Sequence, residues 1–155
     1  MSRVLDSEPV VVPLSRAGLA PARQAYRLLY IAFIAAPIIA GLDKFTNFLV
    51  QWEQYLTPPV AHALPVSAQA LMRAAGIVEI VAGLLVAFRP ALGGYVVALW
   101  LCGIIVNLLL GAGYYDIALR DFGLLLGALA LARLSALFER SQSNPPLDYV
   151  RAISE

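Results

Sequence analysis

The sequence contains few charged residues. They make up 14% of its 155 positions, whereas soluble domains carry about 25%. Apolar residues account for 61% of the chain, and the mean hydropathy is +0.78. This scarcity of charge favours a protein whose solvent is the lipid bilayer. The net charge of +1 also gives no basic surface of the kind that binds nucleic acids, so we expect no nucleic-acid partner.

The chain is equally poor in metal ligands and redox groups. Its one cysteine, Cys102, lies in an apolar run, so a disulfide or a cysteine-based metal site within one chain is excluded. Its one histidine, His62, follows a pair of prolines in a loop without partner ligands nearby, and we predict no metal site. A flavin fingerprint and a P-loop are missing too. We therefore do not expect an oxidoreductase that acts alone.

Four apolar segments are long enough to cross a membrane, which takes roughly 20 residues. They cover residues 27–50, 70–88, 91–113 and 114–134, and Pro37 is expected to kink the first. Residues 51–69 contain three prolines, which prevent a continuous helix, so we expect this segment to lie at the membrane interface. A soluble bundle would need a polar stripe on each helix, and none has one. The predicted fold class is all-α, an integral membrane four-helix bundle.

Basic residues are distributed unevenly between the two ends of these segments. If the N-terminal tail is inside, the cytoplasmic side holds eight lysines and arginines and the opposite side three. By the positive-inside rule, both termini are then cytoplasmic. We predict an N-terminal arm at residues 1–26, a membrane domain at 27–138 and a C-terminal tail at 139–155.

The fourth segment combines a charged pair with small residues. Arg120 and Asp121 precede eleven residues, 122–132, that carry no charge. At helical spacing Arg120, Gly123 and Gly127 share a face, and two glycines four residues apart let membrane helices approach closely. We therefore expect both glycines to lie against another helix, in this bundle or in a neighbouring chain. Arg120 should then point at protein and not at lipid.

Six polar residues within or beside the apolar segments form the candidate site: Asp43, Lys44, Glu79, Asn107, Arg120 and Asp121. A charge at the bilayer centre costs about 2.5–3.5 kcal/mol on insertion scales, so we expect these groups to pair. We predict a chain of contacts from Glu79 through Asn107 to Arg120, with Asp121 or Asp43 as the alternative partner of the arginine. Trp52, Trp100, Tyr114 and Tyr115 are expected to anchor the helices at the membrane interfaces.

Two interpretations of this polar set remain open. The groups can be structural ion pairs between helices, or they can line a pocket, open to the outer face, that holds a small molecule or carries protons. A quinone headgroup would suit such a pocket. Its two carbonyl oxygens need donors such as arginine, lysine or asparagine, and its redox protons need a carboxylate such as Glu79.

Several short motifs together resemble the DoxX-like family of small bacterial membrane proteins. They are GLDKF at the end of the first segment, Gly76-Ile77-Val78-Glu79 in the second with Gly83 a turn later, and ALRDFGLLLGALAL in the fourth. The resemblance covers roughly residues 28–134 and reaches Lys44, Glu79, Arg120 and Asp121, but it does not extend to the loop at 51–69. The family includes the membrane subunit of a thiosulfate:quinone oxidoreductase. The resemblance implies a multi-pass protein of the bacterial inner membrane in a redox setting.

The resulting hypothesis is a quinone-linked subunit of a membrane complex, partnered by the lipid bilayer and by other membrane subunits or copies of itself. Two alternatives remain. One is a structural or assembly subunit of a larger complex, and the other is a small oligomeric transporter. Transporters more typically show internal repeats, and the sequence shows none.

Overall fold

The computed structural model describes residues 19–63, 65–111 and 113–143, and these form helices and connections without any strand. Along the chain the elements are α1 (Ala20–Thr46), the 3-10 helix η1 (Trp52–Tyr55), α2 (Pro58–Ala63), α3 (Ala68–Phe88), α4 (Pro90–Leu110) and α5 (Tyr115–Ser143). Within the described residues α1, α3, α4 and α5 are long and apolar enough to cross a membrane. The prediction of an all-α chain with four such helices is therefore confirmed.

Local chemistry explains where the helices begin and end. Proline stands in the first turn of both α1 and α4, where its missing N–H leaves no hydrogen bond unmade. The Ser67 hydroxyl accepts a hydrogen bond from the Ala70 N–H and caps α3. At the end of α1, Asn47 adopts a left-handed conformation (φ 51°), and its N–H donates to the Asp43 carbonyl at 2.7 Å. This turn ends the helix.

The bounds of the helices differ from those predicted, most of all for α1 and α5. α1 begins at Ala20 and ends at Thr46, so residues 20–26 belong to the first helix and not to the N-terminal arm. α5 runs on to Ser143, past the predicted end of the fourth segment, because no helix-breaking residue precedes the Asn144-Pro145 step. The remainder of the predicted arm (1–18) and of the tail (144–155) lies outside the described residues.

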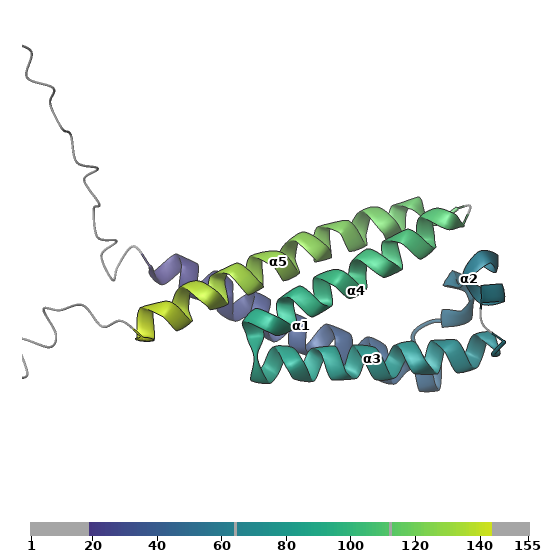
Figure 1. Cartoon of the computed structure of the whole chain (residues 1–155), viewed down its shortest axis with the longest axis horizontal. Coiled ribbons are helices and arrows are strands. Elements are labelled where there is room, and N and C mark those ends of the chain that lie inside the picture. Colours follow the sequence, from purple (N-terminus) through teal and green to yellow (C-terminus); the bar gives the residue numbers. More distant parts are fainter. Residues whose placement is uncertain (1–18, 64, 112, 144–155) are drawn as a thin grey trace, which may run out of the picture.

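The four long helices form two closely packed pairs, α1 with α3 and α4 with α5. Figure 1 shows the pairs converging at one end of the bundle and spreading apart at the other. We call the first the terminal end, where α1 begins, α5 ends and α3 turns into α4. We call the second the loop end, where residues 47–67 connect α1 to α3. The backbones of the two pairs are therefore farther apart toward the loop end.

Small residues set how closely the helices approach. A side chain at Gly41 would place its Cβ 2.5 Å from the Gly76 carbonyl oxygen, so α1 and α3 meet backbone to backbone at this point. A Cβ at Gly94 would lie 2.8 Å from the Ala128 carbonyl oxygen, which marks the same kind of contact between α4 and α5. The core contains seven buried residues, toward the terminal end, where all four helices meet: Phe33, Ala82, Val86, Val97, Ala98, Ala128 and Leu131.

The two glycines of α5 differ in their surroundings. A Cβ at Gly127 would lie 3.2 Å from the Phe33 ring, so this position packs against α1 as expected. A Cβ at Gly123 would meet nothing within 4 Å. The prediction is thus confirmed for Gly127, whereas Gly123 lies against no other helix among the described residues.

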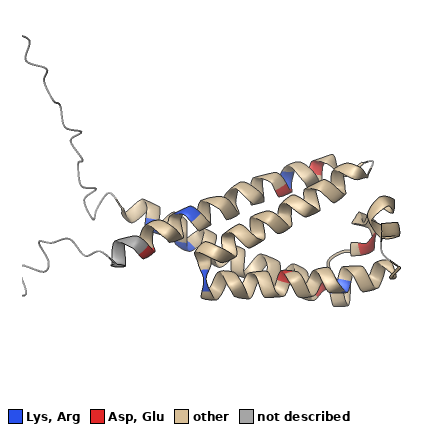
Figure 2. Cartoon of the chain, viewed as in Figure 1, with Lys and Arg blue, Asp and Glu red and all other residues tan. Residues whose placement is uncertain are grey.

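The outer surface of the bundle is apolar. Exposed leucine, isoleucine, valine and phenylalanine side chains cover every long helix, with Leu28 (71% exposed), Val81 (58%), Leu99 (76%) and Leu119 (72%) as examples, one from each. Soluble monomers do not expose apolar surface on this scale, so the surface favours contact with lipid. Figure 2 shows most of the described acidic residues in the half of the bundle nearer the loop end.

Candidate functional site

The site begins with two neighbouring residues at the end of α1, Asp43 and Lys44, which are both 6% exposed. The Asp43 carboxylate accepts hydrogen bonds from the backbone N–H groups of Phe48 and Leu49 at 2.9 and 3.0 Å, and from the Thr46 hydroxyl at 3.1 Å. It therefore fixes the turn that follows α1. Because successive residues of a helix point about 100° apart, Lys44 faces a different neighbour.

That neighbour is Glu79 of α3. The Lys44 Nζ lies 2.6 Å from the Glu79 Oε2, and both side chains are less than a tenth exposed. The close approach of α1 and α3 at Gly41 and Gly76 brings the two residues within reach, since each charged residue lies three positions beyond one of these glycines. A buried charge must be paired, and here the two partners come from the two helices of one closely packed pair.

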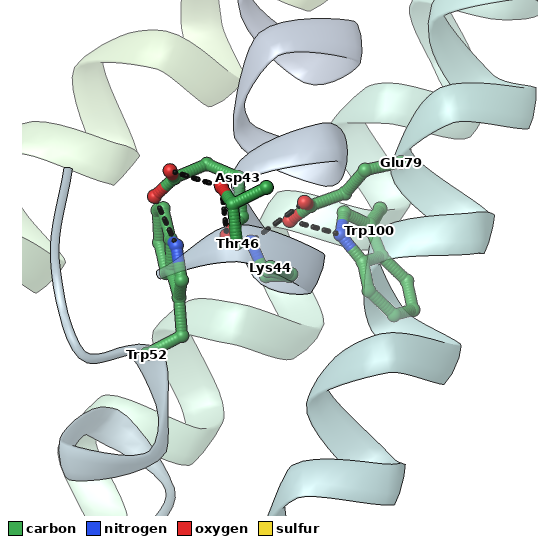
Figure 3. A network of polar contacts seen from close by, with 6 residues as sticks. All are labelled: Asp43, Lys44, Thr46, Trp52, Glu79 and Trp100. Atoms are coloured by element: carbon green, nitrogen blue, oxygen red, sulfur yellow. Dashed lines mark hydrogen bonds and ion pairs between the residues drawn. The ribbon is translucent and has the colours of Figure 1, made fainter. Parts of the chain in front are cut away.

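Two tryptophans flank this ion pair (Figure 3). The Trp52 ring lies under the lysine, with Nζ 3.6 Å from the ring centroid, an arrangement that stabilises an ammonium group. The Trp52 indole N–H also donates to Asp43 at 2.7 Å. On the other side, the Trp100 indole N–H of α4 donates to the Glu79 Oε1 at 3.4 Å.

The sequence interpretation of Trp100 as an interface anchor was wrong. Trp100 stands in the middle of α4, and its N–H points into the bundle toward a carboxylate. One signal could have identified it. Trp100 precedes Asn107 by seven residues, which is two helical turns, so the indole and the amide share one face of this mainly apolar helix.

Asn107 itself binds the loop between α1 and α3. Its Oδ1 accepts hydrogen bonds from the Thr57 N–H and hydroxyl, at 3.3 and 3.0 Å, and its Nδ2 donates to the Tyr55 carbonyl at 2.8 Å. Thr57 is buried, 3% exposed, and its methyl group packs on Gly111 at the end of α4. Asn107 therefore fastens residues 55–57 across the loop end of the bundle.

The predicted chain from Glu79 through Asn107 to Arg120 is not formed. Glu79 pairs with Lys44, Asn107 binds the loop, and Arg120 makes no hydrogen bond or ion pair within the part of the chain that the structure describes. The reason is the order of the helices around the bundle. α5 packs against α4 and α1, whereas α1 packs directly against α3. A lysine on α1 is therefore closer to Glu79 than an arginine on α5.

A cavity of about 470 Å³ connects most of the candidate residues. All four long helices and the loop line it, and its walls are chiefly apolar and aromatic. Its charged and amide side chains are Lys44, Glu79, Asn107, Arg120 and Asp121. Five of the six candidates thus share one cavity, and the sixth, Asp43, supports the loop beside it. The volume and the few convergent polar groups are typical of small-molecule sites.

Other charged, polar or reactive side chains lie outside this cavity. Arg73 is exposed on α3, His62 is exposed on α2, and Cys102 is exposed on α4. Glu53 accepts hydrogen bonds from the Asn47 amide at 3.3 and 3.4 Å. None of these residues contacts the lysine–glutamate pair.

The chain matches no family model, no curated protein and no solved structure. Its own geometry therefore has to define its class. That class is a helical protein with four potential membrane spans and an internal, mainly apolar cavity. Within the cavity, one buried ion pair stands between two tryptophans.

Proposed function

We propose that this chain is a DoxX-like, multi-pass protein of the bacterial inner membrane that binds a quinone in its cavity and serves as the quinone-linked subunit of a membrane redox complex. The observation that carries the proposal is the lysine–glutamate pair between two indole rings in the wall of an apolar cavity. It combines a hydrogen-bond donor, a proton carrier and aromatic surfaces in one place.

Each part matches a need of a quinone. A quinone ring is flat and apolar, so aromatic side chains in the cavity wall such as Trp52 and Trp100 suit it. Its carbonyl oxygens accept hydrogen bonds, and Lys44 has three N–H donors, one of which is committed to Glu79. Reduction of a quinone to a quinol takes two electrons and two protons. Glu79 is the carboxylate placed to exchange such protons.

The electrons have to come from elsewhere in the proposed complex. We assign their delivery to a partner subunit that carries a redox group, because the residues around the cavity are proton carriers and hydrogen-bond donors. The chain's own part is then to bind the quinone, orient its carbonyl groups and supply protons. In the proposed orientation the terminal end is cytoplasmic, since the described arginines Arg23, Arg27, Arg89 and Arg133 lie in that half.

The test is to purify the protein from its native membrane in mild detergent and to quantify extracted quinone by chromatography. We expect about one quinone per chain in the wild type and a large loss in Lys44→Met. The matched control is Arg73→Gln, which removes a charge from α3 outside the cavity and should retain the quinone. Wild-type protein with no more quinone than an unrelated membrane protein from the same cells would overturn the proposal.

One observation favours a second candidate, a structural or assembly subunit. The Lys44–Glu79 pair is complete within the chain and is bonded to α4 through Trp100, so it can join helices without any ligand. If Glu79→Gln lowers the stability of a protein that never contained quinone, the pair is structural and this second function is favoured.

A further inference from the structure

The exposed part of the cavity wall is confined to two helices. Of all the residues that line the cavity, four are exposed: Ala32 and Ala36 of α1, and Arg120 and Leu124 of α5. The lining residues from α3, α4 and the loop are buried or half-buried. These four residues therefore mark the place where the cavity opens, and we call them the mouth.

Contacts already described cross the other boundaries of the cavity. α1 and α3 meet backbone to backbone at Gly41 and Gly76, and the Trp100–Glu79 hydrogen bond joins α4 to α3. At the loop end, Asn107 binds the Tyr55 carbonyl and so keeps the loop across the opening between the pairs.

Side-chain contacts between α1 and α5 begin at the edge of the mouth nearer the terminal end and continue toward that end. The Phe33 ring packs on Gly127, and farther on the rings of Tyr26 and Phe138 lie 5.4 Å apart. Above these contacts, toward the loop end, no hydrogen bond, ion pair or ring contact joins the described residues of the two helices. Together with the exposure of the four lining residues on α1 and α5, this favours an opening to the side, between these two helices.

The mouth faces lipid. Ala36 lies ten residues before the end of α1, which corresponds to about 15 Å along the helix, and Leu124 lies nine residues after the start of α5, about 14 Å. With a hydrocarbon core about 30 Å thick, both positions fall well inside it. Arg120 lies one helical turn closer to the loop end, where its long side chain can reach the headgroups.

The α1 side of the mouth is lined by small side chains. Ala32, Ala36 and Ala40 recur every four residues and all three line the cavity, so they form a smooth strip along its edge. A larger residue at the middle position would project into the gap between α1 and α5.

We propose that the mouth is a lateral portal through which a quinone enters from the bilayer, and that its long apolar tail remains between α1 and α5 while the headgroup lies at Lys44 and Glu79. This inference rests on the proposed function and adds to it the class of quinone, one with a lipid-soluble tail, and the path it takes. The tail, and not the headgroup, is what the strip of alanines and Leu124 contact.

The test compares two tritium-labelled probes, decylubiquinone and the same headgroup without a tail, in lipid nanodiscs, with concentrations expressed per lipid. Ala36→Phe narrows the mouth. The matched control is Ala35→Phe, because Ala35 is the adjacent exposed alanine of α1 and does not line the cavity. We expect Ala36→Phe to weaken binding of the tailed probe by about tenfold or more and that of the tailless probe by less than about twofold. Ala35→Phe should leave both unchanged.

Three results would overturn the portal. They are equal effects of the two substitutions, equal losses of both probes in Ala36→Phe, and no preference of the wild type for the tailed probe. Should Ala36→Phe fail to fold, as judged by gel filtration, Ala32→Phe tests the same edge. If the wild type binds neither probe, the proposed function itself fails. If it binds both probes and the variants behave alike, only the portal fails.

Discussion

The Lys44–Glu79 pair allows the sharpest test of how the bundle is held together. We consider three variants, Lys44→Met, Glu79→Gln and the double substitution. Each single change leaves a buried partner without its counter-charge, whereas the double change leaves two neutral side chains of similar size. The structure therefore predicts that the double variant is more stable than either single variant.

The magnitudes follow from the geometry. At an effective dielectric constant of about 20, two unit charges separated by the 2.6 Å of this pair attract by roughly 6 kcal/mol. Desolvation of each ion cancels several kcal/mol of this. Removing one partner of a buried pair typically costs about 3–5 kcal/mol, so about that loss is expected for the single variants.

The two single variants should differ in how much stability they lose. In Glu79→Gln the Trp52 ring still stabilises the lysine, by up to about 2 kcal/mol. We therefore expect this variant to lose about 3 kcal/mol of stability. In Lys44→Met the remaining partner of Glu79 is the Trp100 indole, through a long hydrogen bond. We therefore expect this variant to lose about 5 kcal/mol of stability. The double variant should lose only about 1 kcal/mol, because the introduced glutamine can still accept a hydrogen bond from Trp100.

The assay is reversible unfolding in mixed micelles of mild detergent and dodecyl sulfate, followed by circular dichroism. The losses expected for the three variants imply a coupling energy of about 7 kcal/mol in the double-mutant cycle. Strictly additive losses, with a coupling below about 0.5 kcal/mol, would refute the reasoning, since they would show that the two side chains do not sense each other.

Three further predictions concern helix packing, the turn after α1 and the orientation in the membrane. Gly127→Leu should destabilise the protein by about 1–3 kcal/mol, because the new side chain meets the Phe33 ring, whereas Gly123→Leu should leave the melting temperature in detergent nearly unchanged; equal effects would contradict the packing. Asp43→Ala removes the acceptor of two backbone N–H groups and one indole, so protease should cleave the chain after α1 faster than in the wild type. Asp43→Glu should bring the cleavage rate part of the way back to that of the wild type. An unchanged rate in Asp43→Ala would show that the turn does not depend on this carboxylate. In a Cys102→Ser background, a cysteine at position 62 should react with an impermeant thiol reagent from outside the cell and one at position 142 should not; the reverse pattern would invert the proposed orientation.

Much of the fold could be predicted from the sequence, because apolar runs of sufficient length identify membrane-crossing helices directly. The exact ends of the helices could not be predicted in this way. α1 stops at Thr46 although the apolar residues Phe48, Leu49 and Val50 follow, since the left-handed turn at Asn47 and the hydrogen bonds to Asp43 end it. Hydropathy does not report such local contacts.

The members of the site were easier to predict than their pairing. Charged residues inside apolar segments are expected to be buried or paired, and this rule selects Lys44, Glu79, Arg120 and Asp121. Lys44 and Glu79 meet the expectation, whereas Arg120 lines the cavity but is exposed and forms no ion pair with the described residues, so the prediction that it points away from the surface was wrong. Which of them meet depends on the order of the helices around the bundle and on the rotation of each helix about its axis. The positions of small residues in the sequence predicted neither of these. Trp100 was misjudged for a related reason. Tryptophan occurs at membrane interfaces and also in ligand cavities, so its presence alone does not distinguish the two.

The position of the tryptophans has a practical consequence. The sequence contains two of them, and both lie against the same ion pair, one on the lysine and the other on the glutamate. Tryptophan emission responds to the polarity around the indole and is quenched by nearby electron acceptors. The tryptophan fluorescence of the protein therefore originates from a single place, so the emission of the unlabelled wild type should report on a molecule that enters the cavity.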